Sequence, residues 1–367
     1  MRWQDEIKNS ITTLDQLSEY AKLPLDEDKR LRRVAKRHPM AMTRYYASLI
    51  DWTDPDDPIR RMAVPCVEEL NVAGTYDTSG EASNTKMPGL QHKYAQTALI
   101  LATNRCAMYC RHCFRKRLVG LTNEEILSRF GEAVAYVKRH NEINNVLISG
   151  GDPLILPTRV IREFLRRLSP IAHLCFIRLG SRTPVTFPQR IYGDRELLAV
   201  LKRYSAGDKR LFLVTQFNHP REITEQSTRA VSRLIEAGVV LNNQTVLLSG
   251  VNDDPDTLAE LQNRLVGIGV NPYYVFQCRP VKRVKHCYQV PFRRGYEAVE
   301  KAKRQLNGHS KRFRYAMSHK TGKIEIVGIM GNDIYLKYFQ AKSPKNAGRF
   351  FKRRLTDNAA WLDDLGP

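Results

Sequence analysis

The sequence has no apolar run long enough to cross a membrane and no segment with the character of a signal peptide. A membrane-spanning helix needs roughly 18 or more consecutive apolar residues, and no run in this chain of 367 residues approaches that length. The N-terminal residues MRWQDEIKNS are polar and lack an apolar core. The composition, with 42% hydrophobic and 26% charged residues, is typical of a folded globular chain. We therefore expect an ordered cytoplasmic protein without a membrane partner.

The sequence also lacks the cysteine pattern of a disulfide framework. It has seven cysteines, an odd number in a long chain. Three of them, Cys106, Cys110 and Cys113, form one cluster. The other four are scattered along the chain: Cys66, Cys175, Cys278 and Cys287. This usage favours metal chemistry in a reducing compartment over structural disulfides.

Acidic residues are few relative to basic ones, which leaves a formal net charge of +21. The basic residues concentrate in the segments 29–38, 111–117, 279–285 and 349–354. Such charge attracts polyanions, so nucleic acid is not excluded as a partner. The sequence has no recognisable nucleic-acid-binding motif, such as an aromatic and basic RNP repeat. We therefore interpret most of the charge as solvated helix faces, with a few arginines that bind small anions.

An alternation of apolar runs and amphipathic stretches begins at residue 97. The apolar runs suit buried parallel strands, and the stretches between them have helical periodicity. The predicted strands are 97–102, 145–149, 175–179, 211–216, 239–248 and 273–277. The predicted helices are 123–139, after an N-cap-like Thr122, and then 158–168, 194–204, 223–237, 255–265 and 295–306. Strands that alternate with helices predict an α/β fold with a parallel sheet, either a barrel or a doubly wound sheet.

Polar residues follow the predicted strands, and this placement favours the barrel. Cysteines follow the first strand, a glycine pair follows the second, and Ser181 follows the third. Active sites of βα barrels form at the carboxyl ends of their strands. We therefore predict a partial (β/α)6 barrel, similar to a TIM barrel, over residues 96–310. An N-terminal helical extension, 1–95, precedes it, and a C-terminal segment, 311–367, follows it.

The clustered cysteines have the pattern C-x3-C-x2-C directly after the first predicted strand. A 4Fe–4S cluster normally takes four cysteines, so a cluster held by three keeps one iron open for another ligand. One alternative is a structural zinc with His112 as the fourth ligand. Another is three buried free thiols. The spacing favours the cluster.

The second predicted strand ends in Ser149-Gly150-Gly151-Asp152. Paired glycines are common in strand-to-helix turns because they relieve steric strain. They also let backbone approach a small molecule closely. The position beside the cysteine loop, on the same predicted edge of the sheet, favours a ligand.

These motifs together resemble those of radical S-adenosylmethionine (SAM) enzymes. In more detail, the sequence resembles that of the lysine 2,3-aminomutase family over about residues 39–328. The segments that carry this resemblance are MYCRHCFRKRLVG, ISGGDPL, SRTPVTFPQRI, FNHPREIT, NNQTVLLSGVND and NPYYVFQC.

The resemblance implies that Cys106, Cys110 and Cys113 hold a 4Fe–4S cluster whose open iron binds SAM. Reduction by a donor such as flavodoxin or ferredoxin then cleaves SAM to a 5'-deoxyadenosyl radical. This radical abstracts hydrogen from an amino acid bound to pyridoxal phosphate (PLP), so that nitrogen migrates to the neighbouring carbon. The residues that match SAM contacts are Ser149, Gly150, Gly151, Asp152, Ser181 and Gln244.

The resemblance also implies a PLP lysine near the C-terminus. Lys323, in the segment SHKTGKI, falls at that position, and Lys320 is a nearby rival. The glycine-rich loop common in the family is reduced here to Gly322.

Near the PLP phosphate the resemblance is incomplete. The segment His92-Lys93-Tyr94 matches one beside the phosphate, with which Lys93 could pair, and Arg111 matches a phosphate contact. However, Thr97 stands where many family members have an arginine. We therefore expect weaker phosphate binding than in those members.

The substrate side departs further from lysine-using members. Arg115 matches the arginine that binds the substrate carboxylate, a task that suits a planar bidentate donor. Two aspartates that surround the distal ammonium of lysine are replaced here by Arg279 and Ala316, and Lys282 and Arg283 follow closely. We therefore expect an amino-acid substrate with an anionic end, unless Arg279 points to solvent.

Two other functions stay open at this point. One is a PLP-independent radical SAM enzyme on the same scaffold. The other is a basic, zinc-containing nucleic-acid-binding protein. Self-association and the role of the basic tail after about residue 336 are also left open.

Overall fold

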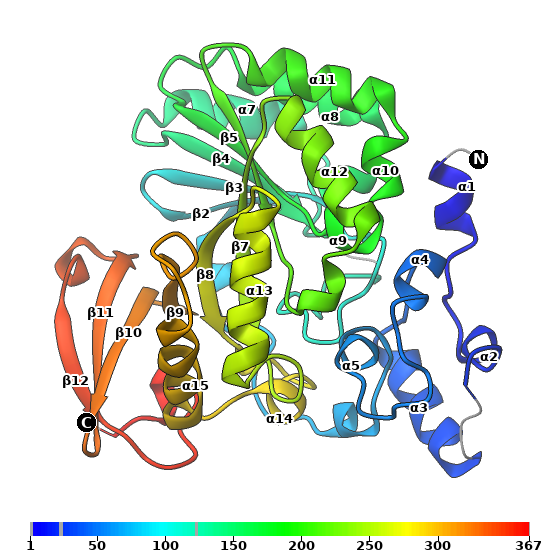
Figure 1. Cartoon of the computed structure of the whole chain (residues 1–367). Helices are drawn as coiled ribbons and strands as arrows, with labels where there is room; N and C mark the ends of the chain where they lie inside the picture. Colours follow the sequence, from blue (N-terminus) through cyan, green and yellow to red (C-terminus); the bar gives the residue numbers. More distant parts are fainter. Residues whose placement is uncertain (1–2, 22–24, 122–123, 367) are drawn as a thin grey trace.

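The computed structural model describes residues 3–21, 25–121 and 124–366, and one sheet forms its centre (Figure 1). Twelve strands lie in the sheet in the order in which they occur in the sequence. They are β1 (Thr85–Met87), β2 (Leu90–Tyr94), β3 (Thr97–Thr103), β4 (Asn145–Gly150), β5 (Phe176–Gly180), β6 (Arg210–Thr215), β7 (Val240–Leu247), β8 (Asn271–Gln277), β9 (Arg314–His319), β10 (Gly322–Met330), β11 (Asp333–Ala341) and β12 (Phe350–Arg354). Strands β3 to β9 are parallel, and the outer strands pair antiparallel.

The six predicted strands correspond to β3–β8 in the structure. The parallel run then continues into β9, which lies in the segment expected to be a C-terminal extension. A second addition is the hairpin of β1 and β2, in the segment expected to be a helical extension. Neither addition contains a long apolar run, so the position of these strands in the sheet depends on pairing with a neighbour.

Helices fill the connections between the parallel strands, as the periodicity predicts. They are α7 (Phe130–Arg139), η2 (Pro153–Ile155), α8 (Thr158–Leu168), α9 (Thr183–Thr186), α10 (Gln189–Tyr192), α11 (Arg195–Ser205), η3 (Pro220–Glu222), α12 (Glu225–Glu236), α13 (Pro255–Gly267), α14 (Lys285–Tyr288) and α15 (Phe292–Arg304). Helix α7 begins later than predicted, and the expected N-cap Thr122 lies outside the described residues. The N-terminal segment is mainly helical: α1 (Trp3–Lys8), α2 (Leu14–Leu17), α3 (Leu25–Arg37), α4 (Arg44–Ala47), α5 (Pro58–Ala63), η1 (Val67–Leu70) and α6 (Glu81–Asn84). Two short turns near the C-terminus are η4 (Pro344–Asn346) and η5 (Leu362–Asp364).

Helix α8 shows why these stretches are helical and where they pack. Ile161, Phe164, Leu165 and Leu168 recur at helical spacing and are buried. Full burial of such a side chain contributes roughly 1.5–3 kcal/mol. They belong to the main hydrophobic core, which lies between the helices and the parallel strands. A second core lies between α15 and strands β9–β11.

The sheet curves until a side chain of β2 contacts β9. Lys93 Nζ on β2 donates to the His319 carbonyl oxygen on β9 at 2.6 Å. Beyond the end of β11, Lys342 Nζ contacts Ser83 Oγ on α6 at 3.0 Å. The inner face of the curved sheet therefore collects side chains from strands that are far apart in the sequence.

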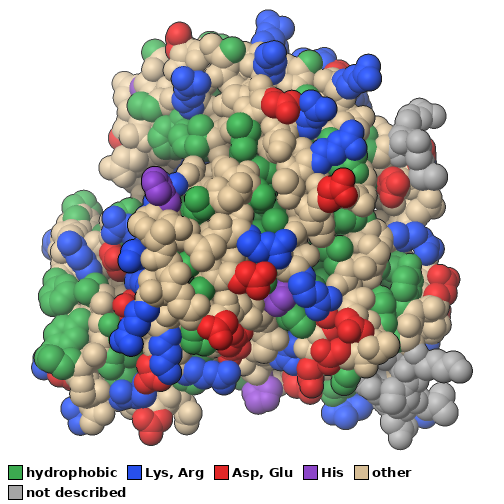
Figure 2. Space-filling view, in the orientation of Figure 1, with side chains coloured by type: hydrophobic (Ala, Val, Ile, Leu, Met, Phe, Trp, Pro, Cys, Tyr) green, Lys and Arg blue, Asp and Glu red, His purple; other side chains and the backbone are tan. Residues whose placement is uncertain are grey.

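The basic surface does not form a single stripe on the face shown in Figure 2. There, lysine and arginine side chains are interspersed with aspartate and glutamate. Across the described part of the chain, no helix is both long enough and apolar enough to span a membrane.

Candidate active site

The cysteine loop leaves the carboxyl end of β3. All three thiols are half-buried and unpaired. Burial raises the pKa of the Cys106 thiol well above its usual value and that of Cys113 to about 11. Arg182, which follows β5, donates from Nη1 to Cys110 Sγ at 2.9 Å. The loop therefore joins three potential thiolate ligands with one cation.

The geometry of the loop fits a cluster better than a single zinc ion. Thiolates around one zinc, with bonds of about 2.3 Å, lie roughly 3.8 Å apart. Among the described residues, the three sulfurs are not a group whose ligand atoms all lie within 4.8 Å of one another. His112 is also turned away, because its Nε2 accepts from the amides of Gln216 at 3.1 Å and Asn218 at 3.2 Å. In a neutral ring that leaves the proton on Nδ1, which then has no lone pair for a metal.

The glycine pair after β4 presses against the chain that enters the cysteine loop. A Cβ on Gly150 would lie 2.5 Å from the Thr103 carbonyl oxygen, and one on Gly151 would lie 2.3 Å from that of Arg105. Gly150 also has φ +104°, which disfavours other residues. Close backbone packing therefore requires both glycines, whether or not a ligand also contacts them.

Asp152 and Ser181 contact each other and connect the ends of β4 and β5. Ser181 Oγ donates to Asp152 Oδ1 at 2.6 Å, and the Arg182 backbone N–H donates to Oδ2 at 2.8 Å. Burial raises the pKa of the Asp152 carboxyl. Gln244 lies on β7 with a half-buried side chain. Roles in SAM binding stay predictions for all three residues.

Arg182 was not singled out from the sequence, although it directly follows Ser181. Besides contacting Cys110, its guanidinium pairs with the buried Glu222, which also accepts from the Tyr46 hydroxyl at 2.7 Å. This network fixes a cation beside one cysteine of the loop. Its position in the segment SRTPV is the signal that could have found it.

A second group of cations lies on the inner face of the sheet. We call it the cationic cluster, and it contains Lys93, Arg115, Arg178, Arg279 and Lys323. Lys323 Nζ on β10 lies 5.0 Å from the centre of the Tyr274 ring on β8. Burial, together with the charges of Arg178 and Arg279, lowers the pKa of Lys323 to about 7.

Lys93 and Arg279 are affected in the same way. Burial and the charges of Arg279, Lys342 and Lys323 lower the pKa of Lys93 to about 7. Burial lowers the pKa of Arg279 to about 10. Arg279 donates to Ser79 Oγ, and to Ser318 Oγ at 2.9 Å. Arg279 therefore points inward, so the alternative in which it faces solvent is wrong.

Two polar atoms beside these cations lack hydrogen-bond partners among the described residues. They are the buried Tyr94 hydroxyl and the buried Nε of Arg178. Arg178, on β5, was also missed from the sequence, because an arginine between apolar strand residues gives no pattern of its own. Several buried cations and unpaired donors on one face have the chemistry of an anion-binding site.

One carboxylate that lies in this region is Glu81. It pairs with Arg115 at 3.3 Å and with Arg117 at 2.6 Å. Arg115 and Arg279 both stack on the Phe114 ring, at 4.4 and 4.2 Å. Arg115 is therefore placed between the cysteine loop and Arg279, as a substrate anchor requires, but it is already partly neutralised.

The structure speaks against the predicted phosphate contact of Arg111. Its guanidinium forms a bidentate pair with Glu69, at 2.7 and 2.6 Å, and also donates to the carbonyl oxygens of His38 and Pro39. These contacts engage Nε and both terminal nitrogens, so a phosphate would have to displace Glu69. Sequence matching could not show this pair, because Glu69 lies 42 residues before Arg111 in the chain.

The two rival lysines have different surroundings. Lys320 is exposed and pairs with Asp363 at 3.2 Å. Lys323 points inward, with a lowered pKa. Of the basic residues after Arg279, Lys282 lies over the Tyr76 ring and Arg283 donates to the Glu69 carbonyl oxygen. Lys282 and Arg283, which the sequence placed close to Arg279, therefore do not belong to the cationic cluster.

Comparison with known proteins identifies the family. The family model described as "Radical SAM superfamily" matches residues 100–261. A protein of Aquifex aeolicus is 42% identical over 343 residues, which are 93% of this chain and 91% of that protein. The L-lysine 2,3-aminomutase of Clostridium subterminale is 40% identical over 311 residues, 84% of this chain and 72% of that enzyme. The chain belongs to the lysine 2,3-aminomutase family of radical SAM enzymes.

The similar proteins also include an enzyme named for a different amino acid. The glutamate 2,3-aminomutase of Clostridioides difficile is 38% identical over 287 residues, 78% of this chain and 66% of that enzyme. The chain is therefore a radical SAM isomerase with a 4Fe–4S cluster and SAM as cofactors, and the lysine 2,3-aminomutases of its family also use PLP. It acts on a small molecule and takes electrons from a reductant. The zinc-containing nucleic-acid-binding protein considered from the sequence is not supported.

Proposed function

We propose that this chain is a PLP-dependent 2,3-aminomutase for an amino acid with an anionic side chain, rather than for free lysine. The observation that supports this is the inward orientation of Arg279 beside Lys323. Ala316, at the second position expected to read the substrate, is also buried on β9. Its neighbours Tyr315 and Met317 belong to the second core, so by strand alternation Ala316 faces inward. A cation and a methyl group would not hold an ammonium.

We also propose that the curved sheet forms a partial (β/α)6 barrel. Six parallel strands, β3–β8, with the cysteine loop and the glycine pair at their carboxyl ends, support this arrangement. The segments 1–95 and 311–367 then act as extensions that close the inner face. The contact of Lys93 with His319 joins these two segments.

The residues have separate tasks in this proposal. When bound, the cofactors supply radical generation and the electronic means for nitrogen migration. Cys106, Cys110 and Cys113 hold the cluster. Lys323, whose pKa of about 7 leaves much of its amine neutral at physiological pH, holds PLP.

The remaining cations orient the anions. Lys93 and Arg178 bind the PLP phosphate. The Tyr94 hydroxyl, which has no hydrogen-bond partner among the described residues, can donate to the same phosphate. Arg115 binds the substrate carboxylate, and Arg279 binds the anionic side chain. Burial of these donors strengthens their interaction with anions, because the surrounding dielectric is low.

The first test is uptake of PLP. Purified protein incubated with PLP should show the visible absorption band of lysine-bound PLP. This band should disappear in Lys323→Ala and persist in the matched variant Lys320→Ala, because Lys320 is exposed and pairs with Asp363. A protein that never takes up PLP would overturn the proposal in favour of a PLP-independent radical enzyme.

The second test is the substrate. Anaerobically reconstituted enzyme, supplied with SAM, PLP and reductant, is screened with L-glutamate, L-aspartate and L-lysine for β-amino acid products. We expect turnover with an acidic amino acid and little with lysine. Substantial conversion of L-lysine to β-lysine would show that our assignment of Arg279 and Ala316 is wrong.

A further inference from the structure

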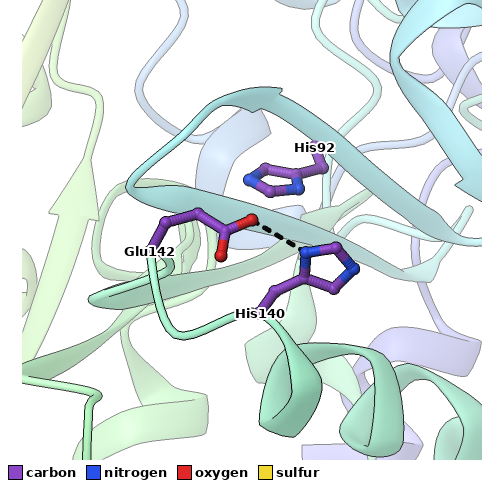
Figure 3. A group of neighbouring side chains, drawn as sticks. All are labelled: His92, His140 and Glu142. Carbon is purple, nitrogen blue, oxygen red and sulfur yellow. Dashed lines mark hydrogen bonds and ion pairs between the residues drawn. The ribbon is translucent and has the colours of Figure 1, made fainter.

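A group of three potential metal ligands lies away from the cysteines (Figure 3). His92 is on β2, His140 ends α7, and Glu142 is in the connection from α7 to β4. One ligand atom from each lies within 4.8 Å of the other two. Among the described residues this is the one such group of three or more. The proposed function assigns no role to this group.

Hydrogen bonding fixes the tautomer of His92. Its Nε2 lies 3.0 Å from the Ala95 carbonyl oxygen, which can only accept, so Nε2 carries the proton. Nδ1 therefore carries a lone pair, which accepts from the Tyr136 hydroxyl at 3.0 Å and which a bound metal would take over from that hydroxyl. Histidines that bind metals are usually held in this way, with the other ring N–H donated to a carbonyl or carboxylate.

His140 and Glu142 face the same point. His140 Nδ1 lies 2.8 Å from Glu142 Oε1, where Figure 3 shows the contact. The His140 ring also stacks on Tyr136, with ring centres 4.0 Å apart. Glu142 is exposed and His140 half-buried, so both can move closer together around an ion.

We propose that His92, His140 and Glu142 bind one zinc ion, with water completing the coordination. Two imidazole nitrogens and a carboxylate oxygen are donors that suit zinc, with bonds of about 2.0–2.2 Å. The carboxylate supplies negative charge where the chain as a whole carries +21. Zinc would replace the proton shared by His140 and Glu142.

The proposed site lies at the amino ends of β3 and β4, where it would link β2 to the connection between α7 and β4. The cysteine loop leaves the other end of β3, so the two metal sites are separated by the length of that strand. His92 directly precedes Lys93 and Tyr94 on β2. Zinc would therefore stabilise the strand that carries two side chains of the anion-binding face, without contacting the substrate.

The test uses full-length protein without a histidine tag, purified anaerobically and with its iron–sulfur cluster reconstituted. After chelator treatment and zinc titration, we expect one tightly bound zinc per chain and a higher thermal unfolding midpoint. His140→Gln and Glu142→Gln should each weaken zinc binding by roughly a hundredfold or more, since even the partners of metal ligands contribute about ten- to a hundredfold. The control His309→Ala, an exposed histidine elsewhere, should bind zinc like the unaltered chain. Equal zinc affinity in all four proteins would overturn the proposal.

A second measurement separates this site from the cysteines. A variant with Cys106, Cys110 and Cys113 all changed to alanine should still bind zinc. Cobalt in its place should lack the thiolate-to-metal absorption that cysteine ligands produce. Loss of zinc binding in this triple variant would show that the metal was held by the cysteines, and the proposal would fail.

Discussion

The molecule buries positive charge in two places, which differ in whether a buried carboxylate compensates that charge. Around Glu69, the cations Arg111 and Lys116 share one buried carboxylate, with contacts of 2.6 Å each. On the inner face of the sheet, Lys93, Arg178 and Lys323 have no such partner among the described residues. The first group is complete within the protein, whereas the second would be completed by anions from outside.

The pKa values express the same difference. In the Glu69 group, burial alone would raise the pKa of the carboxyl, but Arg111 and Lys116 lower it to about 2. In the cationic cluster, burial and neighbouring cations act in the same direction and lower the pKa of Lys323 to about 7. A buried, compensated charge is a structural feature, whereas a buried, uncompensated one indicates a binding site. This is why Arg111, which the resemblance placed at a phosphate, belongs to the first group.

The largest expected effect comes from breaking the compensated group. Glu69→Gln would leave Arg111 and Lys116 buried without a counter-charge. We expect the free energy of unfolding to fall by about 3–5 kcal/mol, the usual cost of removing one partner of a buried pair. Urea denaturation measures this loss. The neighbouring exposed Glu68→Gln is the matched control and should change stability little. Equal stability of both variants would contradict the distinction drawn here.

A smaller effect is expected from changing the uncompensated group. Arg279→Asp, combined with Ala316→Asp, would place two carboxylates where lysine-using members have them. We expect the ratio of kcat/KM for L-lysine over an acidic amino acid to rise by roughly tenfold or more, since removing like-charge repulsion is worth at least about 1.4 kcal/mol. Lys282→Asp, which makes the same charge change as Arg279→Asp alone but near Tyr76, should leave the ratio unchanged. An unaltered ratio in the double variant would remove Arg279 from the substrate site.

The smallest effect is a pH dependence that differs between the two groups. Lys323 has a folded pKa of about 7, below its unfolded value of about 10.4, so between these values the unfolded chain binds more protons. Stability of the cofactor-free protein should therefore rise with pH across that window, and Lys323→Met should flatten the rise. Thermal unfolding midpoints measured from pH 7 to 10 test this.

Glu69 contributes in the opposite range. Its folded pKa of about 2 lies below its unfolded value of about 4.3, so its stabilisation is present above the unfolded pKa and is lost as pH falls toward the folded one. The stability difference between the unaltered chain and Glu69→Gln should thus shrink in acid. A difference independent of pH would count against the pair as the source of that stability.

Much of the fold followed from local pattern. The strands β3–β8 and helices such as α8 are long enough, and periodic enough, for their residues to predict them. The cysteine spacing and the glycine pair likewise carry their chemistry in a few adjacent residues. Strands without an apolar run were different: β1, β2 and β9 depend on pairing partners, and the sequence alone does not name those partners.

The sequence by itself determined the family and predicts the three cysteines as cluster ligands, because both depend on residues close together in the chain. Only the tertiary structure decided which basic residues are paired. Arg111 meets Glu69, Arg279 turns inward beside Lys323, and Lys320 turns outward to Asp363. Charge compensation is a matter of distance and burial in space, and the curvature of the sheet sets both.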